Sequence, residues 1–167
     1  SPNGQRVLVA ARGEVFSVPV EHGISRNLTR SPGAHEREVA WSPKGDRVAW
    51  ISDASGEEEI YVADHLGQAS ATRVTSESST RLYRPLFSPD GSKIVYGDSE
   101  ARIFVVDSDG GNKRQVADDA SIDQQATVDL EARGAWDLIL VLHPDRPAAE
   151  FKWRIRVGGV GEGIPAR

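Results

Sequence analysis

A tetrapeptide of the form Ser-Pro-x-Gly occurs three times in this chain, each time with similar sequence around it. The copies begin at Ser1, Ser42 and Ser88, so they are spaced by 41 and 46 residues. Each is followed by a polar pair and then by a short apolar run. Proline presets φ at the second turn position and glycine accepts a positive φ near the end. We therefore expect each copy to be a tight turn that leads into a strand.

Four short strands are predicted for each repeat. Their apolar and β-branched runs cover residues 7–10, 48–51 and 94–96 directly after the turns, then 14–18, 59–63 and 102–106, then 26–29, 72–75 and 114–117, and finally 39–41 and 85–87. A period of about 40 to 50 residues with four strands is typical of a β-propeller blade. We predict an all-β chain that forms a partial β-propeller of about three to four four-stranded blades.

The repeat also predicts where a fourth copy should stand. In two repeats an aromatic residue lies 13 residues after the apolar residue of the outer strand, from Leu28 to Trp41 and from Val74 to Phe87, and Ser-Pro follows it directly. The same spacing from Val116 reaches Asp129, which is followed by Leu130 and Glu131 instead of Ser-Pro. We therefore predict propeller blades over residues 1–117, with repeats that start at 1, 42 and 88. Residues 118–167 are either a degenerate fourth blade or a non-native tail, for example after a shifted reading frame.

The composition excludes several function classes. The net charge of −5 argues against nucleic acid as a partner, because phosphate binding needs a basic patch. No apolar run approaches the roughly 18 residues of a membrane helix, so no membrane is expected as a partner. The chain has no cysteine and hence no thiolate metal site. It also has no methionine, which indicates that Ser1 is an internal residue of a longer protein.

No catalytic, cofactor or metal site is predicted within the chain. The four histidines are scattered without ligand spacing, and no Gly-x-Ser-x-Gly elbow is present. His22 and His65 are expected at the surface beside turn glycines. The aromatic residues at equivalent repeat positions are expected to pack between blades: Trp41, Trp50, Tyr61, Phe87, Tyr96 and Phe104.

Two charged segments are candidates for contacts. His35, Glu36 and Arg37 precede a blade's first strand, where they could meet a peptide in the axial channel or a neighbouring domain. The alternative is that they form a salt-bridged structural loop. The run at residues 57–59, which is Glu-Glu-Glu, is expected to be the solvated tip of a hairpin.

These residues resemble a known family. Ser-Pro-Asp-Gly with a following Ile-Tyr-Val strand is similar to the WD40-like repeat of TolB-type propellers. The stretches 11–19, 26–29 and 32–43, which contain Asn27-Leu28-Thr29 and His35-Glu36-Arg37, resemble the second propeller of tricorn-type proteases. The resemblance covers about residues 1–117.

The resemblance implies a parent that is a large cytoplasmic serine peptidase, assembled as a hexamer, which trims oligopeptides. Its propellers are non-catalytic and filter or channel peptides to a later catalytic domain with a PDZ module. Nothing in this chain matches that domain, so no catalytic residue is carried over and the segment itself is expected to be inactive. Its expected partners are the remaining blades and catalytic domain of its own parent chain, and a peptide substrate.

Two alternatives remain open at this stage. A TolB-like propeller would act as a protein–protein interaction module in the periplasm or outside the cell. A propeller from a prolyl-oligopeptidase-like enzyme would be accompanied by an α/β-hydrolase domain.

Overall fold

The computed structural model describes residues 1–76, 78–118, 127–129, 136–141 and 152–157. The chain divides into two compact units, Ser1–Val116 and Ala117–Arg167. All regular elements among the described residues are strands, which confirms the all-β class. The described residues include no helix with the length and hydropathy of a membrane span.

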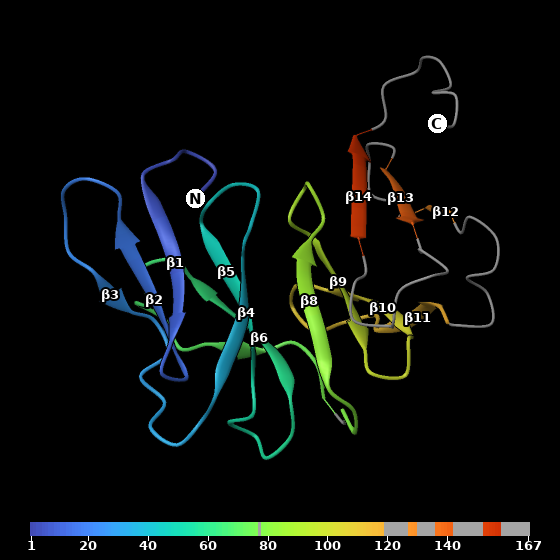
Figure 1. Ribbon diagram of the computed structural model, residues 1–167, viewed down its shortest axis with the longest axis horizontal. Coiled ribbons are helices and arrows are strands. Elements are labelled where there is room, and N and C mark those ends of the chain that lie inside the picture. The colour runs from blue at the N-terminus through green and yellow to red at the C-terminus, as the bar shows by residue number, and fades with distance from the viewer. Residues whose placement is uncertain (77, 119–126, 130–135, 142–151, 158–167) are drawn as a thin grey trace. The chain divides into compact units, whose positions relative to one another are not determined.

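The first unit consists of three antiparallel sheets, which we call blades 1, 2 and 3 (Figure 1). Blade 1 contains β1 (Arg6–Ala11), β2 (Glu14–Pro19) and β3 (Arg26–Asn27). Blade 2 contains β4 (Glu36–Trp41), β5 (Arg47–Ser52), β6 (Glu59–Asp64) and β7 (Thr72–Arg73). Blade 3 contains β8 (Leu82–Phe87), β9 (Lys93–Asp98), β10 (Ile103–Asp107) and β11 (Arg114–Ala117). The partial propeller is thereby confirmed.

The second unit contains one three-stranded antiparallel sheet among its described residues. Its strands are β12 (Thr127–Asp129), β13 (Trp136–Val141) and β14 (Lys152–Val157). Residues 130 and 131, where a fourth Ser-Pro was sought, lie outside the described residues. The choice between a degenerate blade and a non-native tail stays a prediction.

Each Ser-Pro-x-Gly copy forms the same hairpin turn. The N–H of Gly45 donates to the carbonyl of Ser42 at 2.9 Å, and the Ser42 hydroxyl accepts the N–H of Arg47 at 3.0 Å. That hydroxyl also donates to Asp46 at 2.7 Å and holds the pKa of this carboxyl below its usual value. Ser1 and Ser88 make equivalent bonds. The serines therefore stabilise turns, as their motif predicts.

The sequence repeat and the blade are out of step by one strand. The strand that ends each repeat, such as β4, pairs across the Ser-Pro-x-Gly turn with the strand that follows it, β5. The repeat that starts at Ser42 therefore supplies three strands to blade 2 and its last strand, β8, to blade 3. The expectation that the four strands of one repeat form one blade is therefore wrong by one strand. The Ser-Pro-x-Gly turn lies inside a blade and not between two blades.

The core lies between the blades and not within them. Along β5, Val48 and Trp50 pack in the cluster shared with blade 1, whereas Ala49 and Ile51 pack in the cluster shared with blade 3. The strand is thus covered on both faces, which explains its unbroken apolar sequence. The recurring aromatic residues lie in these two clusters, as expected. Burial of each such large side chain stabilises the fold by about 1.5–3 kcal/mol.

Successive blades also touch through two rows of glycines. A Cβ on Gly45 would lie 3.3 Å from Pro2 of the preceding blade, and one on Gly91 would lie 3.8 Å from Pro43. In the second row, Gly67 approaches Leu28 and Gly110 approaches Val74 of the preceding blade. The blades can stack this closely because these positions carry no side chain.

Candidate functional site at the inner edge of blades 2 and 3

β4 and β8 each end their sheet and contact one another, so their free edges lie side by side (Figure 1). Each strand is interrupted by a bulge at the same repeat position. Between Arg37 and Ala40 two residues of β4 stand opposite one residue of β5, and the same irregularity occurs between Tyr83 and Leu86 of β8. A bulge bends its strand and re-aims a side chain, and bulges are enriched beside functional sites.

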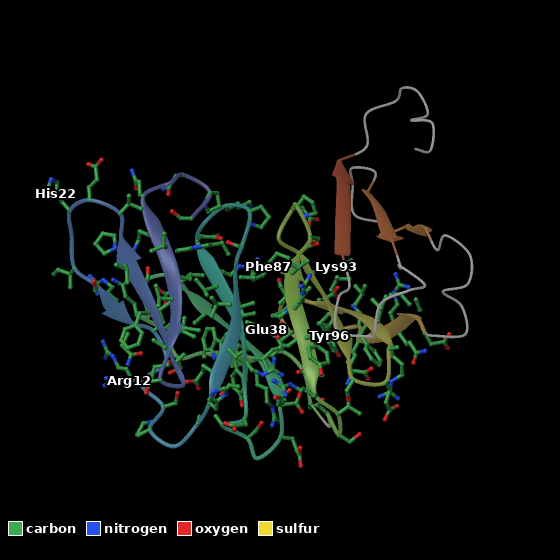
Figure 2. All side chains as sticks on the ribbon, in the orientation of Figure 1. Arg12, His22, Glu38, Phe87, Lys93 and Tyr96 are labelled. Carbon is green, nitrogen blue, oxygen red and sulfur yellow. The ribbon has the colours of Figure 1, made fainter. Side chains whose placement is uncertain are left out.

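The two bulges are bonded to each other. Glu38 and Arg84 occupy equivalent bulge positions and have positive φ values of 51° and 49°. The Glu38 carboxylate accepts the backbone N–H of Arg84 at 2.5 Å. Figure 2 shows Glu38 on β4, on the side of this strand that faces β8. At this unusual backbone conformation, an N–H group of blade 3 thus bonds to a carboxylate of blade 2.

Arg37 joins the same two blades from the neighbouring position. Its guanidinium forms a bidentate ion pair with Glu58 of the β5–β6 hairpin and a second ion pair with Glu38. It also donates to the carbonyl of Leu82 in β8 at 2.7 Å. Glu58 in turn accepts the N–H of Leu82 at 2.8 Å. With 12% of its side chain exposed, Arg37 is a largely buried clamp between blades 2 and 3.

Tyr83 of β8 adds an aromatic face to this end of the inner edge. The guanidinium groups of Arg37 and Arg81 each lie 5.8 Å from the centre of the Tyr83 ring. Such cation–π contacts favour a fixed orientation of both partners. Arg81 is exposed and precedes β8, so it presents positive charge at the rim where β8 begins.

The three residues predicted to make contacts, His35, Glu36 and Arg37, differ in how far their side chains are exposed. His35 has an exposed side chain, and its backbone N–H donates to Asp53 at 2.7 Å. Glu36 is buried, where its carboxylate accepts the hydroxyls of Ser31 and Ser52 at 2.7 and 2.9 Å. Arg37 is the clamp described above. Their contact with a peptide or another domain stays a prediction.

The structure corrects two surface assignments. Of the three glutamates at residues 57–59, only Glu57 is exposed, because Glu58 binds Arg37 and Glu59 is buried against Thr75. His65 is half-buried, with its ring 6.2 Å from that of Trp41. Sequence reasoning missed Glu58 and Tyr83 as members of the inner edge.

A signal for Glu59 was present in the repeat. Thr75 donates to Glu59 and accepts the N–H of Ile60, and Thr29 makes the equivalent bonds with Glu14 and Val15 of blade 1. The spacing from glutamate to threonine is 15 residues in blade 1 and 16 in blade 2. A repeated glutamate–threonine pair at strand ends indicates an internal bond and not a solvated tip.

Comparison with known proteins finds sequence relatives over part of their length. No protein-family model matches the chain. It is 26% identical over 134 residues to the tricorn protease homolog of Saccharolobus solfataricus, which covers 80% of this chain and 12% of that protein. It is 30% identical over 113 residues to tricorn protease homolog 1 of Streptomyces coelicolor, which covers 65% of this chain and 11% of that protein.

Solved structures agree with these relatives. The structure of a protein described as putative TolB from Agrobacterium tumefaciens superposes with a TM-score of 0.61 and 25% identity, over 71% of this chain and 47% of that one. The crystal structure of the tricorn protease superposes with a TM-score of 0.62 over 91% of this chain and 14% of that one. At 16% identity, the latter likeness concerns the fold alone.

The chain is similar in sequence to tricorn protease homologs and in fold to TolB and tricorn propellers.

The chain spans about a tenth of the length of the two curated relatives. Its inner edge combines the edge strands of two sheets with two bulges, an ion-paired clamp and an exposed arginine on an aromatic ring. A sheet edge of this kind can pair with an extended peptide. No group of three or more potential metal ligands occurs in the part of the segment that the structure describes.

Proposed function

We propose that this segment is a non-catalytic part of a tricorn-like serine peptidase and guides oligopeptides along the inner edge of its blades to a catalytic domain elsewhere in the protein. The observation that carries the proposal is the sequence identity of 26–30% with two tricorn protease homologs over 113–134 residues. The parent would be a cytoplasmic homo-oligomer that performs proteolysis. Its remaining blades and catalytic domain would be the segment's partners.

The inner edge supports this role physically. An extended peptide has unpaired backbone groups, which can bond to the edge strands β4 and β8 at residues other than Glu36, Leu82 and Arg84, whose N–H groups are already bonded. A folded protein has few such groups available, so the edge favours extended chains. Arg81 and Arg84, both exposed near this edge, would attract the carboxylates of a peptide.

The test compares long and short substrates in the full-length peptidase. Arg84→Glu reverses a charge at the inner edge, and Arg73→Glu makes the same change on β7, at the outer end of blade 2. We expect Arg84→Glu to lower kcat/KM at least about threefold for an acidic peptide of ten or more residues, while a three-residue substrate is unaffected. Arg73→Glu should leave both rates unchanged. Equal effects of the two variants on the long peptide would contradict the proposal.

A TolB-like interaction module is the second candidate, favoured by the 25% identity with the putative TolB structure. Such a protein would be periplasmic or secreted and would bind a folded partner. Full-length protein without peptidase activity towards any fluorogenic oligopeptide would favour this candidate over the first.

A further inference from the structure

Three side chains of blade 2 bond to the backbone of β8 along the edge where its sheet ends. The Glu58 carboxylate accepts the N–H of Leu82 at 2.8 Å, and the Arg37 guanidinium donates to the Leu82 carbonyl at 2.7 Å. Two residues further along β8, the Glu38 carboxylate accepts the N–H of Arg84. Acceptor, donor and acceptor thus follow one another along the edge. A neighbouring strand presents its carbonyl and N–H groups to an edge in the same alternation.

These three side chains also hold one another in place. Arg37 forms ion pairs with both Glu38 and Glu58, and its guanidinium lies 5.8 Å from the centre of the Tyr83 ring. All three side chains are half-buried. We call Arg37, Glu38 and Glu58 the edge cap of β8. Because each member bonds both to β8 and to another member, the edge cap is fixed in position before any peptide arrives.

The backbone next to the capped positions is itself unsuited to strand pairing. Pro85 has no N–H group, and Arg84 before it has a positive φ in the bulge. Proline and bulges are two devices that keep an edge strand from pairing with another chain. Strand β1 also ends its sheet, but it pairs with β2 in an unbroken register and contains no proline. The two edges therefore differ in whether an added strand finds backbone groups to bond.

We propose that the edge cap closes residues 82–85 of β8 to extended peptides, because it occupies the backbone groups that a peptide strand would use. A peptide strand must break the bonds of the edge cap before it makes its own, so the exchange brings little net gain. The edge cap thereby restricts where a strand can add to the inner edge. This inference refines the site of the proposed function, but it does not require that the chain belongs to a peptidase.

The test removes the two N–H acceptors and follows a peptide strand by NMR. The alanine variant, Glu38→Ala with Glu58→Ala, frees the N–H groups of Leu82 and Arg84. The glutamine variant, Glu38→Gln with Glu58→Gln, keeps an oxygen acceptor at both positions and removes only the charge. The probe is an uncharged peptide of about eight alternating threonine and valine residues, whose backbone can pair with an edge strand. Amide chemical shifts of the isotope-labelled 167-residue chain are measured as the probe is added.

In wild-type protein and in the glutamine variant, we expect the probe to shift the amide signals of β1 and to leave those of Leu82 and Arg84 unchanged. In the alanine variant both of these signals should shift as well, at probe concentrations at least about tenfold lower than any that affect them in wild type. A probe that is N-methylated at every second residue should shift none of these signals, because it cannot donate along one edge.

A shift of Leu82 and Arg84 in wild-type protein would overturn the proposal, since the edge would then be open despite the edge cap. A glutamine variant that responds as the alanine variant does would also overturn it, because acceptance of the N–H groups would not be what closes the edge. The Tm of each variant shows whether it is folded. If the alanine variant is unfolded, Glu38→Ala alone takes its place, and an unshifted Arg84 signal in that folded protein would count equally against the proposal.

Discussion

The carboxylate of Glu38 accepts the backbone N–H of Arg84, the residue that holds the same position in the next blade. Both residues lie in β-bulges with positive φ. A single bond therefore ties two repeats together at the point where each departs from regular strand geometry. The same carboxylate also binds Arg37, so two residues of the inner edge depend on it.

Removal of this carboxylate should weaken the contact between blades 2 and 3. We expect Glu38→Ala to lower the free energy of unfolding by about 1–3 kcal/mol, because it leaves a backbone N–H and part of a guanidinium without an acceptor. Urea denaturation measures this change. Glu57→Ala, at the exposed hairpin tip, should alter the free energy by less than about 0.5 kcal/mol. Equal effects of the two substitutions would contradict the inter-blade role of Glu38.

The ion pair of Arg37 with Glu58 should show measurable coupling. Both side chains are largely shielded, with exposed fractions of 12% and 26%, and the pair is bidentate. We expect a double-mutant cycle with Arg37→Ala and Glu58→Ala to give a coupling free energy of about 1–2 kcal/mol, above that of a surface pair. A value near zero would show that the two residues act independently.

Thr75 should matter through its hydroxyl and not through its size. Thr75→Val keeps the shape but leaves the N–H of Ile60 without its acceptor and removes the hydroxyl donor to Oε2 of the buried Glu59, whose Oε1 still accepts the N–H of Ser78. We expect a loss of about 2–3 kcal/mol in the free energy of unfolding. Thr75→Ser keeps the hydroxyl and should cost less than half as much. If serine and valine were equally destabilising, packing and not the bond would be responsible.

Stability should fall on acidification partly through Asp98. Burial by itself raises the pKa of this carboxyl, but bonds from the guanidinium and N–H of Arg102 and from the N–H of Glu100 outweigh it and hold the pKa below its usual value. A depressed pKa contributes stability above the unfolded pKa of about 3.9, and this contribution is lost as pH falls through the folded value.

The measurement is urea denaturation of wild-type protein and Asp98→Asn between pH 7 and pH 3. We expect the variant to be less stable at pH 7 and the difference to shrink as pH falls below about 4. A difference that stays constant across this range would show that the charge of Asp98 contributes nothing.

Much of the fold could be predicted from the repeat. The Ser-Pro-x-Gly motif located the turns because proline restricts its own φ and glycine can adopt a positive φ, and both effects are local to the turn. The apolar runs located the strands, and the unbroken run in β5 indicated burial on both faces. The recurring aromatic residues identified the inter-blade core. These features depend on residues close together in the chain, so the sequence is sufficient to reveal them.

The grouping of strands into blades could not be read in the same way. The strand before each Ser-Pro-x-Gly turn pairs with the strand after it, so the turn lies inside a blade. A periodic sequence does not show at which residue of the period one blade ends and the next begins. The partnership of Arg37 with Glu58 and Leu82 was also hidden, since these residues lie 21 and 45 positions away from Arg37. Charged residues pair with many possible partners, and only their placement in space selects one.

The sequence by itself therefore determined the turns, the strands and the apolar faces that blades present to one another. Only the tertiary structure decided how these elements are joined, through the bulge contact from Glu38 to Arg84 and the clamp at Arg37, and which apolar residues stay exposed, as Val7 and Val9 do. The reason is physical. Backbone preference and hydrophobic periodicity act along the chain, whereas hydrogen bonds, ion pairs and exposure depend on which distant segments meet.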